Sequence, residues 1–577
     1  MKKTCMMISA LLLCFAIIQG QNTFAPSLHE ALKKEMEYAL ENLVLEGHAL
    51  PFYLSAYLTD LHLIRISAEG GSLFLSRDVP YRGVGGRVMV GDYQMNNENF
   101  LTYNNLFGEM GRFMGTVRDP HPGAVQRSLW MIYDGLYKEA VAHYENKKSV
   151  MKERGVPPGK DGYDFIPGEA VRIMISDRIL LPPLEELEER ARQLSRIIVE
   201  EKSFKESRVD IYAWETLISY VNSEGSFQVY PQAGLVVTVK AYGLTPAGER
   251  EGGQLRIVHS PRDPLPPMDD WRQKIRLFSQ GLKEKISAEA YEDYYEGPVL
   301  FTEEAVAFLF AKSLFGEQDP LIARKRPLYY DMQVASADPE SNKGMMERRY
   351  ERLIISPQLT VKAMPHIDHW EGVSLVGSFP VSAEGVKTKE KLLVSRGILK
   401  NVLGNRTPSQ EGKEAGWHKR WPNPLQIEDA PGVIVVSCEK EDTPKELYEK
   451  MILSAQKNGY DYYLEIASLA EPGYLEPLAE LPGEEYGSVI PIRIYKVFDN
   501  GKRVPLRRVG GVALSPGTLK RLLGVSGPLQ TKNLLFKRKQ SDIYASFIVP
   551  EQVGVEEMSL SGLPDEGFTY EEYLPRP

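Results

Sequence analysis

The chain has 577 residues, which is too long for a single core, so we expect two or three domains. With 43% hydrophobic and 25% charged residues and no low-complexity tract, its composition excludes a disordered chain. The formal net charge of −9 argues against a nucleic-acid partner, which favours a basic surface.

The first 20 residues have the pattern of a secretory signal peptide. Lys2 and Lys3 precede an apolar run from Met6 to Ile18, and Gly20 offers a small residue at the cleavage point. The run is shorter than the roughly 20 residues that span a bilayer. Removing residues 1–20 takes away two lysines and no acids, which changes the net charge from −9 to −11. We therefore predict an exported protein, periplasmic or extracellular, without a transmembrane anchor.

The three cysteines add little chemistry. Cys14 lies within the apolar run after three leucines, where a lipid-attachment site would need a small residue, which argues against a lipoprotein. Cleavage of the signal peptide leaves Cys438 as the only thiol, so no internal disulfide is expected. Cys438 ends an apolar stretch, which favours an inert buried thiol over a nucleophile.

The first two predicted segments combine helix and sheet. In residues 21–105, apolar side chains recur at helical spacing, followed by glycine-linked strand patterns in LHLIRISAEGGSLFLSRDVPYRGVGGRVMVGDY. The helical positions are Leu28, Leu32, Met36, Leu40 and Leu43. Residues 106–285 contain the strongest helix pattern, PPLEELEERARQLSRIIVEEK, and then a turn at 222–225 between strand-like runs. A proline-rich, charged connector at 259–271 is the best candidate boundary.

The third segment, residues 286–577, is predicted to be mainly β. Turns are expected at 395–397 and 499–501, each between two apolar runs. Ser515 and Pro516 predict the start of a helix in SPGTLKRLLG. The predicted fold class is α+β: helix-plus-sheet N-terminal and middle segments followed by a large, mainly antiparallel β C-terminal domain.

Motifs with specific chemistry are scarce. The chain has no GxxxxGK or GxSxG pattern, and RGVGGRV from Arg82 lacks the glycine spacing of a dinucleotide site. His366 and His369 are close enough to share a metal, but a proline precedes them and no third ligand is identified. A surface loop is the better interpretation of that pair.

The stretch GPVLFTEEAVAFLFAKSLFG, residues 297–316, predicts an apolar strand that leads into an amphipathic helix. Thr302 is a natural N-cap, and Glu303 and Glu304 suit the positive end of the helix dipole. The predicted apolar face consists of Val306, Phe308, Leu309, Phe310 and Leu314. Capping alone explains the two carboxylates.

Four collinear stretches resemble the TldD/PmbA (TldE) family of metallopeptidase-like proteins, over roughly residues 30 to 540. They are LEELEERARQLSR with YVNSEGS, GPVLFTEEAVAFLF, SAEGVKTKEKLLVSRGILKNVLGNR, and SPGTLKRLLGVSG. The third of these resembles the family's EGV...L...G.L....L pattern, and the fourth resembles its C-terminal helix.

The resemblance implies what the helix at 303–315 would do in a catalytic relative. Catalytic members carry HExxxH there, with two histidines that bind zinc and a glutamate that activates the bound water. In this chain the three motif positions are Glu303, Glu304 and Phe308, so both histidines are missing. The family's thiolate ligand lies near the C-terminal end, and no cysteine follows Cys438. We therefore expect no catalytic residues, no zinc and no other cofactor.

The resemblance also implies a role in proteolysis without activity in the isolated chain. PmbA-like (TldE) members lack HExxxH and pair with a TldD-like metallopeptidase subunit that cuts unfolded or short peptides. We expect a pseudoenzyme of this kind, an exported subunit of a heterodimer. Two alternatives stay open: a stand-alone peptide-binding protein, and an active metallohydrolase with a rearranged site built from His366, His369 and Glu303.

Overall fold

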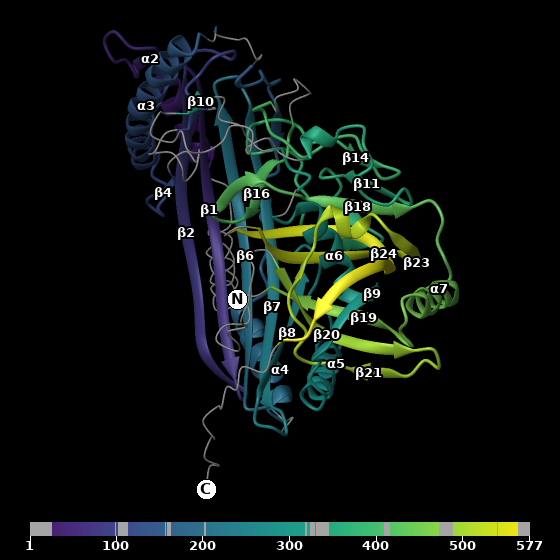
Figure 1. Cartoon of the computed structure of the whole chain (residues 1–577). Coiled ribbons are helices and arrows are strands. Elements are labelled where there is room, and N and C mark those ends of the chain that lie inside the picture. Colours follow the sequence, from purple (N-terminus) through teal and green to yellow (C-terminus); the bar gives the residue numbers. More distant parts are fainter. Residues whose placement is uncertain are drawn as a thin grey trace, which may run out of the picture.

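Two large sheets make up the protein and lie side by side (Figure 1). The computed structural model describes residues 26–98, 100–101, 113–155, 157, 163–200, 204–317, 320–323, 329–330, 346–408, 416–471, 488–538 and 541–563. The predicted signal peptide and Cys14 lie outside these residues. The mixed α+β class with a β-rich C-terminal region is confirmed.

The first sheet has seven strands in the order β4-β2-β1-β6-β7-β5, with β8 paired to β7. Its strands are β1 (Pro51–Glu69), β2 (Ser72–Val90), β4 (Phe113–Gly115), β5 (Arg172–Met174), β6 (Glu206–Asn222), β7 (Phe227–Leu244) and β8 (Arg250–His259). The predicted turn at 222–225 connects β6 to β7. The β1–β2 and β6–β7 hairpins are both antiparallel over nearly their whole length. Strands from the first and middle predicted segments therefore share one sheet.

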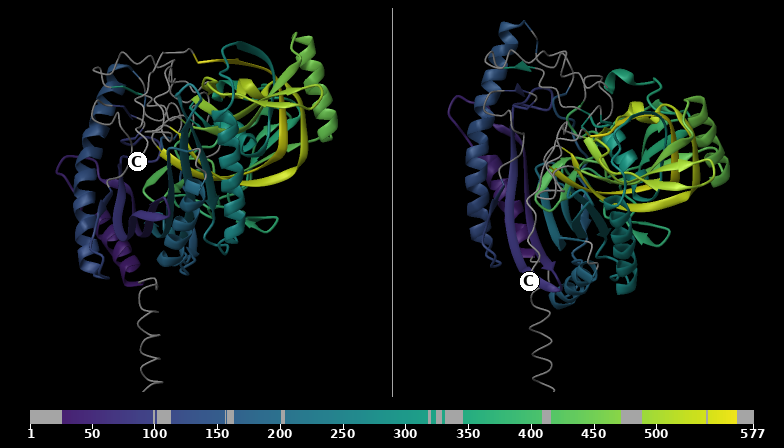
Figure 2. Two further views of the ribbon diagram at one scale, coloured as in Figure 1. Left: turned by 90° about the horizontal axis from the view of Figure 1, so that it is seen from below. Right: turned by 60° about the horizontal axis from the view of Figure 1, so that its bottom comes forward.

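Both faces of the first sheet are covered because its strands alternate with a period of two. Even positions of β1 pack on the helices: Leu54 contributes to a core with α2 (Pro26–Asn42) and α3 (Pro122–Glu153), and Ile64 to one with α4 (Leu184–Glu200) and α5 (Met268–Ile286). Odd positions face the C-terminal region: Leu61 packs with Leu535 and Tyr544 of the second sheet, and Tyr57 packs with Trp421. Figure 2 shows α2 and α3 on the side of the sheet away from the second sheet.

RGVGGRV lies inside β2 instead of in a phosphate-binding loop. A Cβ at Gly83 would meet the Phe113 ring at 2.0 Å, and one at Gly86 would meet the Tyr133 ring at 2.7 Å. These glycines therefore make room for aromatic side chains, which accounts for their number without a ligand.

The second sheet has eleven strands. Its main path is β15-β14-β11-β18-β24-β9-β19-β20-β21, with β22 beside β20 and β23 beside β24. The bounds are β9 (Tyr294–Phe301), β11 (Leu359–Ala363), β14 (Lys391–Ser395), β15 (Ile398–Leu399), β18 (Val433–Cys438), β19 (Tyr462–Ala470), β20 (Ser488–Phe498), β21 (Arg503–Pro505), β22 (Val512–Ala513), β23 (Leu522–Arg538) and β24 (Ser541–Ser561). Only β18 with β24 and β9 with β19 pair in parallel among these strands.

Shorter elements complete the described residues. They are β3 (Phe100–Leu101) with β10 (Tyr329–Tyr330), β12 (His369–Trp370) with β13 (Val373–Ser374), β16 (Lys419–Asn423) with β17 (Gln426–Asp429), the helices α6 (Glu303–Phe315) and α7 (Pro444–Lys457), and two 3₁₀ helices, η3 (Glu347–Arg349) and η5 (Pro516–Leu519). The turns predicted at 395–397 and 499–501 are both confirmed as hairpin turns, with Gly397 and Gly501 at positive φ.

The helix predicted from SPGTLKRLLG is wrong beyond its first turn. Only η5 forms, and β23 begins at Leu522. Leu522 and Gly524 pair with Val555 and Gly554 of β24. Strand pairing in the large sheet therefore overrides the helical propensity of these few residues.

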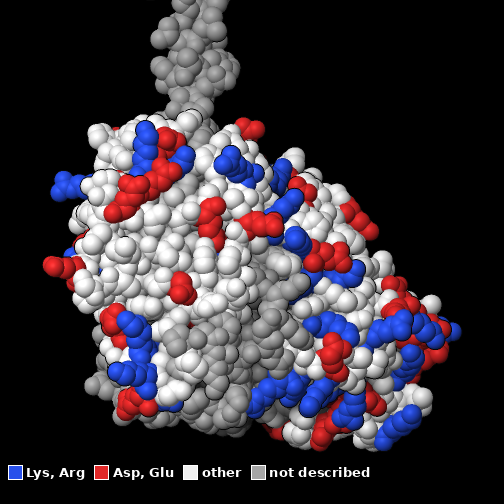
Figure 3. All heavy atoms as spheres, turned by 90° about the horizontal axis from the view of Figure 1, so that it is seen from above, with Lys and Arg blue, Asp and Glu red and all other residues white. Residues whose placement is uncertain are grey.

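No helix among the described residues has the length and apolarity needed to cross a membrane. Charged side chains are unevenly spread over the face seen in Figure 3, where basic and acidic groups intermingle on one side and few charges appear on the other. That face lacks the continuous basic field typical of nucleic-acid-binding surfaces.

Candidate functional site

α6, the helix that carries HExxxH in catalytic relatives, begins at the end of a central strand of the second sheet. β9 lies between β24 and β19, and the chain turns at Thr302 from the end of β9 directly into α6. Thr302 occupies the N-cap position with an extended backbone, but its hydroxyl donates to Glu465 Oε1 at 3.1 Å and makes no cap hydrogen bond. The side-chain cap expected at Thr302 is therefore wrong.

α6 is buried on all sides, so the prediction of an amphipathic helix is wrong as well. Every residue from Ala305 to Phe315 is buried, including Lys312 at 4% exposure. Lys312 is neutralised by Glu471, with Nζ 3.2 Å from Oε1, and it also donates to the Lys537 carbonyl. A helix apolar all round belongs to the core of a large domain, and only its first turn reaches solvent here.

An arginine engages both carboxylates at the start of α6. Arg493 of β20 donates Nη2 to Glu303 Oε2 at 2.5 Å and to Glu304 Oε2 at 3.3 Å. Burial lowers the pKa of Arg493, but the hydrogen bond to Glu303 and the charges of both glutamates outweigh it and raise the pKa above its ordinary value. The guanidinium is thus a fixed cation between the two motif positions.

Glu303 has a strained backbone. Its φ of 52° lies in the left-handed region, which costs a non-glycine residue roughly 1–3 kcal/mol. Such strain persists only where surrounding contacts impose it. The ion pair to Arg493 is the contact that holds this side chain in place.

The residues of this helix do not fit zinc. A zinc site needs three protein ligands that converge on one point, and Phe308 has no donor atom. The two carboxylates are oriented toward Arg493, and a guanidinium repels a metal cation placed among the same oxygens. Glu303 and Glu304 therefore form ion pairs with Arg493, and Phe308 contributes only apolar surface.

Phe308 and Glu304 line a cavity of about 270 Å³ between the two sheets. Its walls are residues 254–259 of β8 on one side and 531–535 of β23 on the other, with 468–471 at the end of β19. Phe308 is 8% exposed, and this exposed edge faces the cavity. The position of the second motif histidine therefore forms apolar cavity wall.

The histidine pair proposed as an alternative metal site is engaged otherwise. His369 Nδ1 lies 3.1 Å from Asp368 Oδ1, and Nε2 lies 2.9 Å from Ser374 Oγ. The hydrogen bond from His369 holds the pKa of Asp368 below its ordinary value. His366 is exposed on the surface. Within the described residues, no three His, Cys, Asp or Glu side chains are grouped to hold a metal.

Cys438 is a free, half-buried thiol at the end of β18. Burial raises its pKa, and Sγ donates to the Lys440 carbonyl at 3.0 Å. Burial is the larger effect, so the protonated thiol, which is a poor nucleophile, is favoured.

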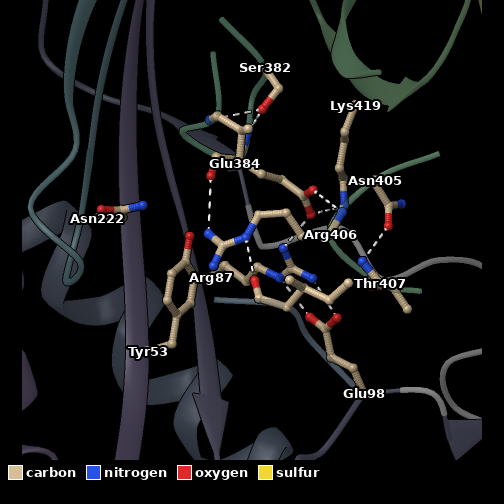
Figure 4. A network of polar contacts seen from close by, with 12 residues as sticks. Tyr53, Arg87, Glu98, Asn222, Ser382, Glu384, Asn405, Arg406, Thr407 and Lys419 are labelled. Atoms are coloured by element: carbon tan, nitrogen blue, oxygen red, sulfur yellow. Dashed lines mark hydrogen bonds and ion pairs between the residues drawn. The ribbon is translucent and has the colours of Figure 1, made fainter. Parts of the chain in front are cut away.

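The EGV...LGNR stretch supplies a buried polar network where the two sheets meet (Figure 4). Arg87 of β2 donates Nη1 to Glu384 Oε1 at 2.8 Å and Nε to Glu98 Oε1 at 2.6 Å. Lys419 of β16 places Nζ 3.6 Å from the same Glu384 oxygen. Glu384 is 3% exposed, so this carboxylate links β2 of the first sheet to β16 in a setting largely without water.

Arg406, from the LGNR end of the stretch, makes the matching contact from the other side. Its guanidinium forms a two-point ion pair with Glu224 at 2.6 and 2.7 Å and lies 4.0 Å from the centre of the Phe165 ring. Arg406 is 1% exposed. Three basic and three acidic side chains thus balance in the network: Arg87, Arg406, Lys419, Glu98, Glu224 and Glu384.

Arg493 was missed from the sequence, although a signal was present. SVIPIRIYKV alternates apolar and other residues, and Arg493 is a charge between two isoleucines of a strand. An arginine in such a strand needs a carboxylate partner, and the two motif glutamates provide it. The link between positions 190 residues apart is visible only in the fold.

Comparison with known proteins identifies the C-terminal region as metallopeptidase-type. Residues 296–452 match the profile of the PmbA/TldA metallopeptidase C-terminal domain. Within this range lie α6, the EGV stretch and Arg406. This match covers the C-terminal part of the chain and supports its similarity to the TldD/PmbA family.

Solved structures share the fold over nearly the whole chain. A proposed modulator of a DNA gyrase from Thermotoga maritima is 14% identical, with a TM-score of 0.59, over 92% of this chain and 99% of its own. TldE from Thermococcus kodakarensis is 13% identical with a TM-score of 0.56, over 92% and 100% of the two chains. A proposed modulator of DNA gyrase from Bacteroides thetaiotaomicron is 10% identical with a TM-score of 0.55, over 92% and 98%. A search of curated protein sequences found no significant match.

Proposed function

We propose that this protein is a non-catalytic TldE-type subunit, exported from the cell, that binds peptides and supports a TldD-like peptidase partner. One observation carries the proposal. Arg493 occupies the space between the two motif carboxylates, and Phe308 presents a ring where the catalytic relatives would present a zinc-binding imidazole. The chain keeps the helix and replaces its metal chemistry with an ion pair.

The proposed export rests on the sequence of residues 1–20, which lie outside the described structure. Fusion of these residues to a reporter that is active only outside the cytoplasm is the direct test. Reporter activity equal to that of a fusion lacking residues 1–20 would remove this part of the proposal.

A stand-alone peptide-binding protein is the second candidate, and the cavity beside α6 favours it. The cavity combines apolar side chains with charged ones, which suits a ligand that has both. This candidate needs no partner chain. The two candidates therefore share the peptide-binding site and differ in whether the protein also binds a peptidase subunit.

Purification of the tagged, full-length protein from its native host, followed by mass spectrometry, tests the proposal. We expect a second chain that carries HExxxH and co-elutes in size-exclusion chromatography. Repeated recovery of a monomer without such a chain would overturn the subunit role and leave the stand-alone candidate. Zinc bound stoichiometrically to the isolated chain would contradict both.

A further inference from the structure

The cavity beside α6 has an unbalanced charge. Three acids line it, and each is already engaged within the protein. Asp263 accepts hydrogen bonds from the Ser374 backbone N–H at 3.0 Å and from the Ser374 hydroxyl at 2.6 Å. Glu304 is paired with Arg493, and Glu471 accepts from Lys312 Nζ at 3.2 Å.

Two lysines of the cavity lack such partners. Lys274 comes from the exposed face of α5, and Lys532 is a half-buried residue of β23 on the other wall. Within the part of the chain that the structure describes, neither ammonium makes an ion pair or a hydrogen bond. A third base, Arg256, donates Nη1 to the Leu535 carbonyl at 2.6 Å and lies 3.8 Å from Glu471.

The acids of the cavity are thus neutralised from within, whereas two positive charges are not. Two ammonium groups on opposite walls without a counter-charge leave the cavity net positive, and an anionic ligand offsets that charge. The apolar wall, which includes Phe308 and Leu534, would contact the non-polar part of the same ligand. At about 270 Å³ the cavity holds only a part of a ligand, since complete ligand sites span roughly 300–1,000 Å³.

We infer that the cavity selects acidic peptides: Lys274 and Lys532 bind side-chain carboxylates of a peptide whose apolar side chains contact Phe308. The inference rests on the proposed peptide-binding function and adds the class of ligand to it. Neither lysine belongs to the family motif. The selectivity therefore depends on residues outside the motif: Lys274 on α5, which packs on the first sheet, and Lys532 on β23 of the second sheet.

Binding of two blocked hexapeptides to the full-length chain tests the inference. Both probes are N-acetylated and C-amidated, so that only side chains carry charge; one has two glutamates and the other has glutamines at the same positions. We expect the acidic probe to bind about tenfold more tightly at about 50 mM salt, with the preference falling at about 500 mM. Isothermal titration calorimetry measures both affinities.

Lys274→Gln and Lys532→Gln are the test variants. Each should weaken the acidic probe about threefold, and the double variant about tenfold, with no change for the neutral probe. Arg276→Gln is the matched control, because Arg276 is an exposed base on the same helix that does not line the cavity. Lys274 and Arg276 are exposed and Lys532 is half-buried, and circular dichroism would verify that the variants fold.

Two results would overturn the inference, and they are distinguishable. Equal binding of both probes by the wild-type chain removes charge selection, and an unchanged preference in the double variant removes its assignment to Lys274 and Lys532; either result leaves peptide binding intact. Absence of binding for both probes removes the peptide-binding part of the proposed function, and the selectivity with it.

Discussion

Glu384→Gln is the sharpest test of the polar network that joins the two sheets. The substitution keeps the shape of the side chain and removes its charge, so the cations Arg87 and Lys419 lose their shared counter-charge. Burial raises the pKa of Glu384, but Lys419, Arg87 and the backbone N–H of Arg406 outweigh it and lower the pKa from 4.5 to about 2. Converted to free energy, a shift of this size is on the order of 3 kcal/mol.

We expect the variant to lose about 3 kcal/mol of unfolding free energy at pH 7, in line with the 3–5 kcal/mol typical of a broken buried ion pair. Urea unfolding followed by tryptophan fluorescence measures the loss, because Trp214 and Trp421 are both buried where the two sheets meet. Glu439→Gln is the control. Glu439 pairs with Arg396 at 2.6 Å, but both side chains are more than half exposed, so under about 1 kcal/mol is expected.

The pH dependence separates charge from packing. A carboxylate with a lowered pKa in the folded state stabilises the protein above its unfolded pKa, and this stabilisation is lost as the pH falls toward the folded value. The difference between wild type and Glu384→Gln should therefore be constant from about pH 6 to 8 and shrink to less than half by about pH 3. A loss below about 1 kcal/mol at pH 7, or an equal gap at pH 3, would refute the charge-network explanation.

Three further predictions concern the motif helix and the first sheet. The double variant Glu303→His, Phe308→His should bind no stoichiometric zinc and show no peptidase activity, because the third ligand is missing. Metal analysis after dialysis, with wild type as the reference, measures the zinc content. One retained equivalent of zinc would contradict the prediction. Glu304→Gln should leave peptide binding unchanged within about threefold, and a complete loss would show that this carboxylate contacts the ligand directly. Gly86→Ala should destabilise the protein by about 1–3 kcal/mol, because the added Cβ would meet the buried Tyr133 ring at 2.7 Å. Gly123→Ala should be neutral or stabilising, because the nearest atom to its Cβ is a side-chain atom at 3.5 Å. Thermal unfolding compares the two variants.

Local pattern was enough to predict the hairpins and the strongest helix. α4 buries Leu187, Ala191, Leu194 and Ile198, which recur at helical spacing, and the hairpin turns at 395–397 and 499–501 have glycine at positive φ. These features depend on neighbours within a few residues. The pattern of period 3.6 or 2 therefore carries the information that determines them.

Long-range contacts explain where the predictions failed. The stretch after Ser515 continues as a strand because β24, some 30 residues later, pairs with it. α6 has no exposed face because strands from three parts of the second sheet surround it, and its one lysine is neutralised by Glu471, 159 residues away. Neither fact has a local signal, since the partner that decides each outcome lies elsewhere in the chain.

The motif residues of this chain divide into two groups with different physical roles. Glu303 and Glu304 sit in the solvent-reaching first turn of α6, where they pair with Arg493, and Phe308 is buried against the cavity. Glu384 and Arg406 sit in the buried network, where each charge is paired with one of opposite sign. Substitutions in the first group would leave the buried interactions of the second group untouched. A chain can therefore keep the family's fold and its recognisable third segment after the metal chemistry has gone, as we propose for this protein.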